Sequence, residues 1–456
     1  MEQQEQLAAF VAATAEEFGV PGLSVGILTG GQELTAAHGV TNLDNPLPVT
    51  ADTLYPLASV SKTYTATAVM RLVAEGRLEL DAPVRRYVPE LRLADEGAAE
   101  RITVLNLLNH TAGLDWNLLG EAAGDGSLES FVAGLAGLSL VAEPGARASY
   151  SQAGYNLLGR VVERVTGLPF EKALAELVLE PAGLRNTFLD TDDIMVRRFA
   201  VGHNRGEDGE ARPATPWRAF RSDDRANNPG GGIVSSVSDL LRWARFHLGT
   251  GDGVLPTELL HGMREQTVEL RASSFGDGIG ICWFLRGVGG ARTLGAGGSG
   301  NGVFTELLIV PERDFAVVSL ANVGPDGYNA NQRVVAWALE HHLGLVEEQP
   351  EPVAHDEARA REVAGRYEND AMALEIATDG ARLTLAVGIK PEIRAAADDE
   401  MPADYGPAAI GFLAADGDDY LVTEGGLQGQ RGFFSRDAQG VVTGVDLAGR
   451  LFPRVG

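Results

Sequence analysis

Residues 54–91 read LYPLASVSKTYTATAVMRLVAEGRLELDAPVRRYVPEL, and this stretch carries Ser59 three positions before Lys62. The apolar residues that follow recur at helical spacing and predict a helix over 60–75. If Ser59 lies at the first turn of that helix, Ser59 and Lys62 share one face, a turn apart. A serine hydroxyl needs a nearby base to act as a nucleophile, and free N–H groups at a helix N-terminus can stabilise an oxyanion. The spacing therefore predicts a nucleophilic serine beside a lysine; the alternative is an N-cap serine with a surface lysine.

Lysine is scarce in this chain, which makes the position of Lys62 informative. The 37 basic residues include only three lysines, and neither Lys172 nor Lys390 follows a serine at the same spacing. With serine at roughly one residue in twenty, three lysines give about 0.15 accidental matches. For Lys62 to act as a base, its pKa must fall through desolvation or through a second nearby cation.

The composition limits the classes of function. The chain has 456 residues, and since a domain takes about 100–200 residues, we expect two or three domains. The 63 acidic residues outnumber the 37 basic ones and give a net charge of −26. This charge argues against non-specific binding of nucleic acid or of an anionic membrane, since both attract basic surfaces.

The N-terminus and the cysteine count concern location. The first 19 residues lack the basic start of a secretory signal, and no apolar run is long enough to span a membrane. We therefore expect a cytoplasmic protein. The single cysteine, Cys282, excludes an intramolecular disulfide, and its apolar neighbours predict a buried strand residue without thiol chemistry.

The first 345 residues alternate between strand-like and helical patterns. An amphipathic helix is expected over 1–19 and a hairpin over 22–39. Later elements are predicted by the same patterns: helices at 155–166, 237–248 and 329–343, and a strand pair in 303–323 around the Pro311–Asp314 turn. This order implies an α/β fold in which the first and last strands meet in one sheet, with the helices inserted between them.

The pattern changes after a linker expected at 346–358, which is rich in Pro and Glu and has no periodicity. Apolar residues then alternate on both sides of an Asp379-Gly380 turn, a strong hairpin signal. Further short strands are expected at 410–414, 419–423, 431–435, 440–446 and 449–454. Roughly five to eight strands in so short a stretch favour a small antiparallel barrel or sandwich. We predict a lipocalin-like barrel over 359–456.

Five segments together resemble the serine β-lactamase-like and penicillin-binding-protein superfamily, in the branch of class C β-lactamases, S12 peptidases and esterases. The first segment is 54–91. The others follow in the family's order: ITVLNLLNHTAGL at 102–114, PGARASYSQAGYNLLG at 144–159, NPGGGIVSSVSDLLRWARF at 228–246 and GAGGSGNGVFTELLIVPERDFAVVSLAN at 295–322. The resemblance implies a β-lactamase-like serine hydrolase domain over 1–345, with an antiparallel sheet and a helical insertion.

The resemblance also implies a Ser-Lys-Tyr site. Ser59 is then the nucleophile, and Lys62 and Tyr150 form the base system. A tyrosine beside an ammonium can take the serine's proton and later protonate the leaving group. The family's Tyr-x-Asn element appears here as Tyr150-Ser151-Gln152. Gln152 replaces the asparagine and offers the same amide hydrogen bonds, to the substrate or to Lys62, through a side chain one bond longer.

The family's third motif, Lys-Thr-Gly or His-x-Gly, falls at Ala296-Gly297-Gly298. Ala296 stands where the family has a cation or an imidazole, which helps to bind an anionic substrate group or to tune the tyrosine. The backbone remains suitable, and the resemblance implies an oxyanion hole made by the N–H groups of Ser59 and Ser299. We expect Ala296, Gly297 and Gly298 to contact the substrate.

Other motifs favour plain structure. Ser24 lies in a G-x-S-x-G pattern but inside the first predicted strand, where a nucleophile elbow does not fit. The glycines of 295–300 match a dinucleotide pattern, but a strand follows them rather than a helix. His110 fits the family's turn motif and is expected to be structural. No spacing of His, Cys and carboxylates suggests a metal, and no cofactor is expected.

The substrate is less determined than the site. The stretches 115–143 and 203–231 are expected to flank the site as irregular loops, and Trp217, with Phe220 and Arg221, is a candidate pocket or lid residue.

We predict an acyl-serine enzyme that cleaves or transfers an acyl group from a small-molecule or peptide ester, amide or thioester. Attack by water gives a hydrolase, and attack by an amine or alcohol gives an acyltransferase or a peptide cyclase. The added β-domain also resembles penicillin-binding-protein-type thioesterases and transacylases of natural-product assembly. A non-catalytic binding protein on a degenerate β-lactamase scaffold is the alternative of another class.

Overall fold

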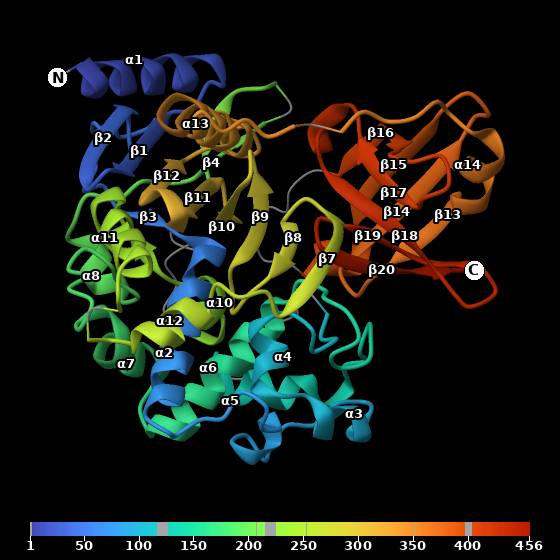
Figure 1. Cartoon of the computed structure of the whole chain (residues 1–456), viewed down its shortest axis with the longest axis horizontal. Coiled ribbons are helices and arrows are strands. Elements are labelled where there is room, and N and C mark those ends of the chain that lie inside the picture. Colours follow the sequence, from blue (N-terminus) through green and yellow to red (C-terminus); the bar gives the residue numbers. More distant parts are fainter. Residues whose placement is uncertain are drawn as a thin grey trace.

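The computed structural model describes residues 2–115, 126–206, 208–214, 225–251, 253–348, 350–396 and 404–456. They form an antiparallel sheet with helices on both faces and, from the C-terminal residues, a closed β-barrel beside it (Figure 1). This arrangement confirms the predicted fold class. Trp217, Phe220 and Arg221 lie outside the described residues.

The sheet has eight strands in the order β2-β1-β12-β11-β10-β9-β8-β7. Their bounds are Gly22–Thr29 (β1), Gln32–Gly39 (β2), Val268–Ser273 (β7), Gly276–Ile279 (β8), Phe284–Val288 (β9), Ala291–Gly300 (β10), Val303–Val310 (β11) and Phe315–Ala321 (β12). β1 pairs with β12 from Leu23↔Ala321 to Thr29↔Phe315, so the first and last strands of this part meet, as predicted. β1 is buried along nearly its whole length because helices cover both faces.

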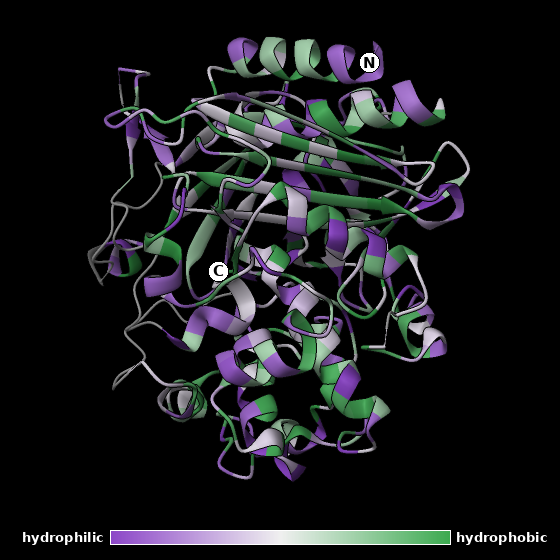
Figure 2. Ribbon diagram, turned by 90° about the vertical axis from the view of Figure 1, so that its left-hand side faces the viewer, coloured by the Kyte–Doolittle hydropathy of each residue, from purple (hydrophilic) through white to green (hydrophobic). Residues whose placement is uncertain are grey.

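Two helices cover one face of the sheet. They are α1 (Glu2–Glu17) and α13 (Asp326–Leu343), and the rings of Phe10 and Trp337 stack between them at 4.3 Å. The opposite face receives α11 (Val237–Leu248), for which Gly26 on β1 leaves room: a Cβ there would lie 2.5 Å from Val237. Figure 2 shows the apolar strands between the two helical layers.

The helical part is inserted between β2 and β7 and contains residues 54–91, with Ser59 and Lys62. Its elements are β3 (Tyr55–Pro56), η1 (Ala58–Val60), α2 (Ser61–Ala74), α3 (Glu96–Arg101), α4 (Val104–Leu108), α5 (Leu128–Gly134), α6 (Gln152–Thr166), α7 (Phe170–Leu174), α8 (Thr191–Met195), β4 (His203–Arg205), β5 (Ala211–Pro213), α10 (Asn228–Gly231), β6 (Val234–Ser235) and α12 (Thr257–Gly262). The predicted helix at 60–75 is therefore confirmed as α2, and the one at 155–166 begins three residues earlier, as α6. The large apolar cluster of this part packs around α2 and α6.

Two expectations about this part need correction. The stretches 115–143 and 203–231 are not irregular throughout, because they contain α5, α10 and the β4–β5 pair. Cys282 is buried but lies in a bend before β9, with φ at 73°, rather than in a strand. Burial raises the pKa of its thiol to about 12, so the thiol stays protonated at neutral pH.

The C-terminal barrel closes in the order β13-β14-β15-β16-β17-β18-β19-β20. Its strands are Gly365–Glu368, Met372–Thr378, Leu383–Ile389, Tyr405–Phe412, Asp419–Val422, Arg431–Arg436, Val442–Leu447 and Arg450–Val455. The predicted Asp379-Gly380 hairpin joins β14 to β15, and Gly380 takes the positive φ of 91° that such a turn needs. Neighbouring strands along the chain are neighbours in the barrel, which is the up-and-down topology of lipocalins.

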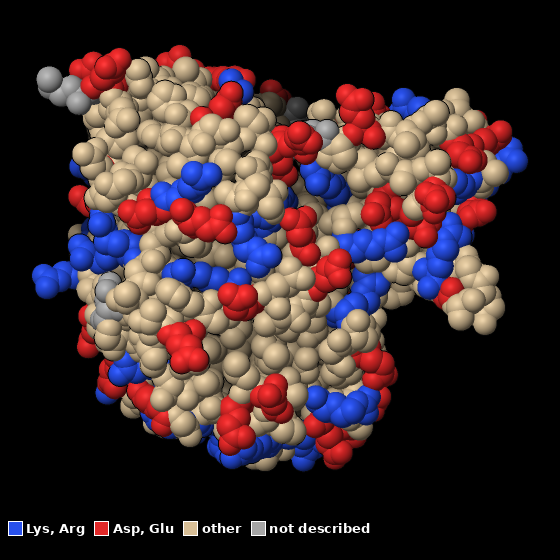
Figure 3. Space-filling model, in the orientation of Figure 1, with Lys and Arg blue, Asp and Glu red and all other residues tan. Residues whose placement is uncertain are grey.

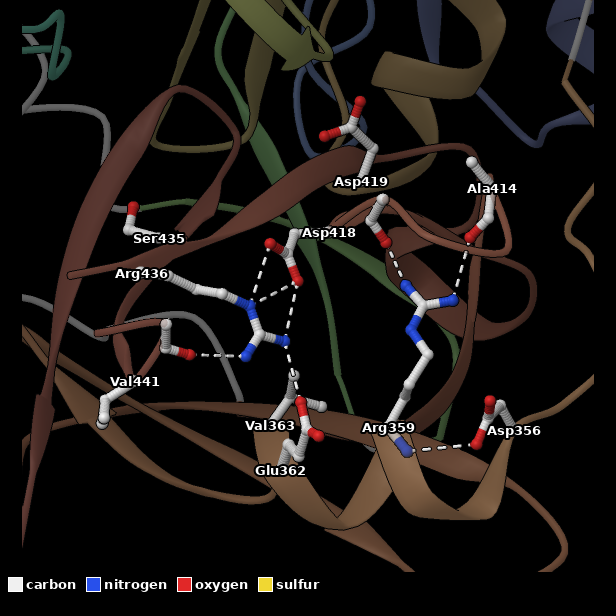
Figure 4. A network of polar contacts seen from close by, with 12 residues as sticks. Asp356, Arg359, Glu362, Val363, Ala414, Asp418, Asp419, Ser435, Arg436 and Val441 are labelled. Carbon is white, nitrogen blue, oxygen red and sulfur yellow. Dashed lines mark hydrogen bonds and ion pairs between the residues drawn. The ribbon is translucent and has the colours of Figure 1, made fainter. Parts of the chain in front are cut away.

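A short helix, α14 (Glu357–Val363), is held against the barrel by two arginines (Figure 4). Arg359 on α14 donates to the carbonyl of Ala414 at 2.9 Å. Arg436 on β18 binds Asp418 through Nε and Glu362 through Nη2, each at 3.0 Å. These contacts tie α14 to the strands that follow it.

The surface carries charges of both signs. On the face shown in Figure 3, acidic and basic side chains are interspersed over both the barrel and the sheet part, by which we mean β1–β12 with the helices around them. Among the residues that the structure describes, no helix is both long and apolar enough to cross a membrane.

Candidate active site

Ser59 lies in the tight turn that leads into α2. The preceding residue, Ala58, has a φ of 45°, which is unusual for a residue with a side chain. The turn is held in place because Leu57 N–H donates to Ile233 O at 2.8 Å. Ser59 is half-buried, whereas Lys62, one turn further on, is 2% exposed. The predicted pair therefore faces a single site at the start of α2.

Lys62 has a full set of hydrogen-bond acceptors. Its Nζ donates to Ser59 Oγ at 3.1 Å, to Gln152 Oε1 at 2.5 Å and to Gly230 O at 2.8 Å. An ammonium group has three N–H donors and no acceptor, so three acceptors match the protonated form. A buried cation in this position attracts negative charge that develops on Ser59 Oγ. The alternative of a surface lysine is wrong.

Gln152, the first residue of α6, fixes Lys62 from the opposite side. While its Oε1 accepts from Lys62, its Nε2 donates to Asn227 Oδ1 at 2.7 Å. The longer glutamine side chain fits because residue 230 is glycine: a Cβ at Gly230 would lie 1.9 Å from Gln152 Nε2. The structure thus places Gln152 on Lys62, and contact of Gln152 with the substrate stays a prediction.

Tyr150 lies two residues before α6 with its ring beside the same ammonium. The distance from Lys62 Nζ to the ring centre is 5.0 Å, within the range of a cation–π contact. On another side the ring packs on His110, with the centres 4.5 Å apart. His110 Nδ1 accepts from Ser151 N–H at 3.1 Å, and burial, followed by the charge of Lys62, holds the pKa of His110 well below its usual value. A neutral His110 that holds Ser151 and Tyr150 in place agrees with the structural role expected for it.

β10 lies along the other side of Ser59. A Cβ at Gly298 would stand 2.1 Å from Leu57 O and 3.1 Å from Ser59 N, so only glycine allows this approach. Ala296 shares the face of Gly298 because side chains alternate along a strand, and it is 6% exposed. β10 pairs with β9 only as far as Gly295↔Phe284. β10 also contacts η1, the short helix that contains Ser59. The exposed Ser299 belongs to this stretch, and its N–H as a second oxyanion donor stays a prediction.

Three residues of the site were not predicted: Asn227, Gly230 and Arg450. Gly230 lies in the NPGGG run at 228–232, and Asn227 comes directly before it. The three glycines of this run were the signal in the sequence that could have pointed to both residues. Arg450 comes from the barrel, and its guanidinium carbon lies 4.9 Å from the centre of the Tyr150 ring. No pattern in the sequence pairs Arg450 with Tyr150.

The competing candidates lie elsewhere. Ser24 is fully buried in β1, where its Oγ and the hydroxyl of Tyr55 form a 3.0 Å hydrogen bond, so it is a strand serine. Within the described ranges, no group of three or more His, Cys, Asp or Glu side chains could hold a metal ion.

Comparison with known proteins gives the family. The model of the Beta-lactamase family matches residues 7–342, and the chain belongs to this family. Penicillin-binding protein 4 of Amycolatopsis lactamdurans is 32% identical over 327 residues, which cover 68% of this chain and 83% of that protein. Esterase EstB of Burkholderia gladioli is 35% identical over 280 residues, 54% of this chain and 69% of the esterase. The family and these relatives indicate an enzyme of the serine hydrolase type.

Solved structures match beyond the family region, and SurE is an example. SurE superposes with a TM-score of 0.75 at 25% identity and covers 100% of this chain and 99% of its own. The family match ends at 342, before the barrel, whereas the likeness to SurE includes the barrel. The two-part architecture of this chain is therefore shared with another protein.

Proposed function

We propose that this chain is an acyl-serine enzyme that moves an acyl group from a small-molecule or peptide ester, amide or thioester to an acceptor through Ser59. The observation that carries the proposal is the contact of Lys62 Nζ with Ser59 Oγ at 3.1 Å, with the Tyr150 ring 5.0 Å from the same nitrogen. The nucleophile therefore contacts the cation, and the ring of the candidate proton carrier lies beside the same cation. Membership of the β-lactamase family and the likeness to an esterase support the same chemistry.

Acylation begins with loss of the hydroxyl proton of Ser59. Because all three N–H donors of Lys62 are engaged, we assign Lys62 as the ammonium that holds Ser59 Oγ, and Tyr150, as its phenolate, takes the proton. Ser59 Oγ then bonds to the acyl carbon, and the N–H groups of Ser59 and Ser299 receive the oxyanion. Collapse breaks the bond to the leaving group, which takes the proton from Tyr150. The acyl group remains on Ser59.

Deacylation repeats these steps with the acceptor. Water, an amine or an alcohol gives its proton to Tyr150 and attacks the acyl carbon, and the proton returns to Ser59 Oγ as the acyl bond breaks. Water as acceptor makes the enzyme a hydrolase. An amine or an alcohol makes it an acyltransferase, or a peptide cyclase when the amine belongs to the acyl chain itself.

Transfer to an amine is the second candidate, and SurE, a structural neighbour over the full length, gives a reason to test it beside hydrolysis. SurE has also been solved with D-Leu, an amino acid. The family carries a cation or an imidazole where this chain has the neutral Ala296. This difference argues against activity on the substrates of cell-wall peptidases and periplasmic β-lactamases. We therefore propose free amino acids and peptide N-termini as acceptors to test.

The test is acylation of the full chain by a p-nitrophenyl ester or a fluorophosphonate, followed by intact-mass measurement and peptide mapping. We expect one adduct on Ser59 and none in the Ser59→Ala variant. Adding D-Leu to the ester assay separates the two outcomes, since aminolysis that outruns hydrolysis identifies a transferase. Failure of every activated acyl donor to modify Ser59 would identify a non-catalytic binding protein instead.

A further inference from the structure

The barrel touches the candidate active site through one turn. The turn between β19 and β20 lies against residues 149–150 of the sheet part. Tyr150 N–H donates to Gly449 O at 2.8 Å, and Leu451 N–H donates to Ser149 Oγ at 3.2 Å. These two bonds fix the backbone on either side of Arg450, so the barrel holds this side chain at a defined place beside Tyr150.

The shape of the turn makes this approach possible. Leu447 pairs with Arg450, so Ala448 and Gly449 form a two-residue hairpin loop. Their φ values are 51° and 69°, the positive pair that a type I′ turn requires. A Cβ at Gly449 would lie 2.4 Å from the ring of Phe275. The Phe275 ring in turn packs on Tyr150, with the centres 5.4 Å apart.

Further polar contacts hold the junction between the barrel and the sheet part together. Arg147 binds Asp446 of β19 at 3.6 Å and Ser435 of β18 at 2.9 Å. On another side, Arg271 of β7 binds Asp419 of β17 at 2.7 Å. The barrel is therefore tied to the sheet part both beside the active site and away from it.

Tyr150 has two cations beside its ring. Lys62 Nζ is 5.0 Å from the ring centre and the guanidinium carbon of Arg450 is 4.9 Å from it. Burial lowers the pKa of Arg450, and attraction to Tyr150, then to Asp446 and Asp115, opposes that shift. Arginine keeps its charge at any pH at which an enzyme works, so the cation beside Tyr150 is permanent.

The third family motif carries no cation in this chain, and the contact of Arg450 with Tyr150 bears on that absence. A side chain at 296 shares the face of Gly298, which lies against Ser59, and in this chain it is the methyl group of Ala296. We infer that the barrel completes the active site: Arg450 replaces the cation that Ala296 cannot supply and acts as a positioning residue through Tyr150. The inference rests on the proposed function.

In this role Arg450 gives up no proton and forms no bond to the substrate. Its charge stabilises the phenolate of Tyr150 before acylation and orients the hydroxyl for its return of the proton to the leaving group. The role differs from recognition of an anionic substrate group, which would show only with a charged acyl donor. A neutral donor therefore separates the two possibilities.

The experiment measures acylation of the full chain by neutral p-nitrophenyl acetate under saturating and subsaturating conditions. We expect Arg450→Met to lower the maximal acylation rate about 100-fold and Arg450→Lys to lower it less than about 10-fold, because the charge is kept. A cation or imidazole at position 296, introduced as Ala296→His or Ala296→Lys in the Arg450→Met background, should raise the acylation rate of that variant at least about 10-fold. A purely structural role of Arg450 would not be rescued in this way.

The matched control is Arg147→Met, which removes the neighbouring junction contact with Asp446 and leaves Tyr150 its cation. We expect its acylation rate to stay within about 3-fold of the wild type. The inference is overturned if Arg450→Met acylates like the wild type or changes only its KM, or if Arg450→Lys is as poor as Arg450→Met. It is also overturned if neither substitution at Ala296 restores the acylation rate of Arg450→Met. An Arg147→Met variant that loses as much acylation rate as Arg450→Met would overturn it as well. Failure of the wild-type chain itself to acylate would instead overturn the proposed function.

Discussion

The two sides of the candidate site are assembled in different ways. Ser59 and Lys62 stand three residues apart on one turn of chain, and their relation is set by the helix that follows. Tyr150 and Arg450 come from different parts of the molecule and meet only where the β19–β20 turn docks. One side depends on local geometry, and the other depends on an interface.

This difference determines how each side can fail. The buried Lys62 has three acceptors from three segments, so its position is over-determined and changes there act directly on the nucleophile. The Tyr150 side is held by two hydrogen bonds from backbone N–H groups, one to a carbonyl and one to the Ser149 hydroxyl, and by side-chain packing across the junction. Loosening the barrel should therefore weaken proton transfer and leave the Ser59–Lys62 pair in place.

The largest effect is expected on the local side, from Lys62→Arg. A planar guanidinium cannot place three donors at the positions of the Nζ hydrogens, so it cannot hold Ser59, Gln152 and Gly230 at once. We expect the acylation rate of Ser59 to fall on the order of 10³-fold, measured by intact mass with an activated ester. A Lys62→Arg variant that acylates at the wild-type rate would contradict the assignment of Lys62.

A smaller effect on the same side is expected from Gly230→Ala. The new Cβ would lie 1.9 Å from Gln152 Nε2 and displace the amide that holds Lys62, so we expect a loss of about 10- to 100-fold in acylation. The shorter side chain of Gln152→Asn should relieve the clash and restore part of the rate in the double variant.

Gly231→Ala is the matched control for that clash, since a Cβ at Gly231 would come no closer than 3.9 Å to its neighbours. It should acylate like the wild type. Equal losses in the Gly230→Ala and Gly231→Ala variants would show that the run tolerates no side chain at all, and the proposed fit between Gly230 and Gln152 would be wrong.

The local patterns of the sequence were enough to predict the sheet, α2, the Ser59–Lys62 pair and the Asp379-Gly380 hairpin of the barrel. Helix α2, the Ser59–Lys62 pair and the hairpin depend on residues close together in the chain, where hydrophobic periodicity and turn chemistry act. The pairing of β1 with β12 joins residues far apart in the chain, and it was predicted from the order of strands and helices. Gly230 and Arg450 could not be assigned because their roles are set by what lies opposite them in space. An arginine at the start of a strand is ordinary in sequence, and only the docking of the barrel gives Arg450 its neighbour.

The junction itself can be weakened without touching any charged group, by Gly449→Ala. This substitution places a Cβ 2.4 Å from the Phe275 ring at a residue with φ of 69°, so it adds a clash to backbone strain. Gly440→Ala is the control, since Gly440 also has a positive φ, 83°, but nothing within 4 Å of its Cβ position. We expect both variants to lose about 1 kcal/mol of stability from strain and Gly449→Ala to lose about 2 kcal/mol more, measured by urea unfolding. Equal losses would mean that the turn is not tightly packed on Phe275.

The smallest effect concerns the dependence of stability on pH at the same junction. Burial raises the pKa of Asp446 to about 7, against the opposing charges of Arg147 and Arg450. In the unfolded chain the pKa of an aspartate is about 4, so between about pH 4 and 7 only the folded state keeps this proton. The free energy of unfolding should therefore fall as pH rises through this window, by about 1.4 kcal/mol per pH unit for Asp446, and level off above pH 7.

Asp446→Asn stays neutral at every pH and should remove this share of the slope. The half-buried Glu306, in the sheet part, also has its pKa raised to about 7 by desolvation, and because it remains in the variant it should keep its own share. Urea unfolding at pH 5, 6 and 7 would then give a slope of roughly half the wild-type value when only these two groups contribute. A slope that Asp446→Asn leaves unchanged would show that Asp446 is ionised in the folded chain, in which case it partly neutralises Arg450 and leaves Lys62 as the stronger cation acting on Tyr150.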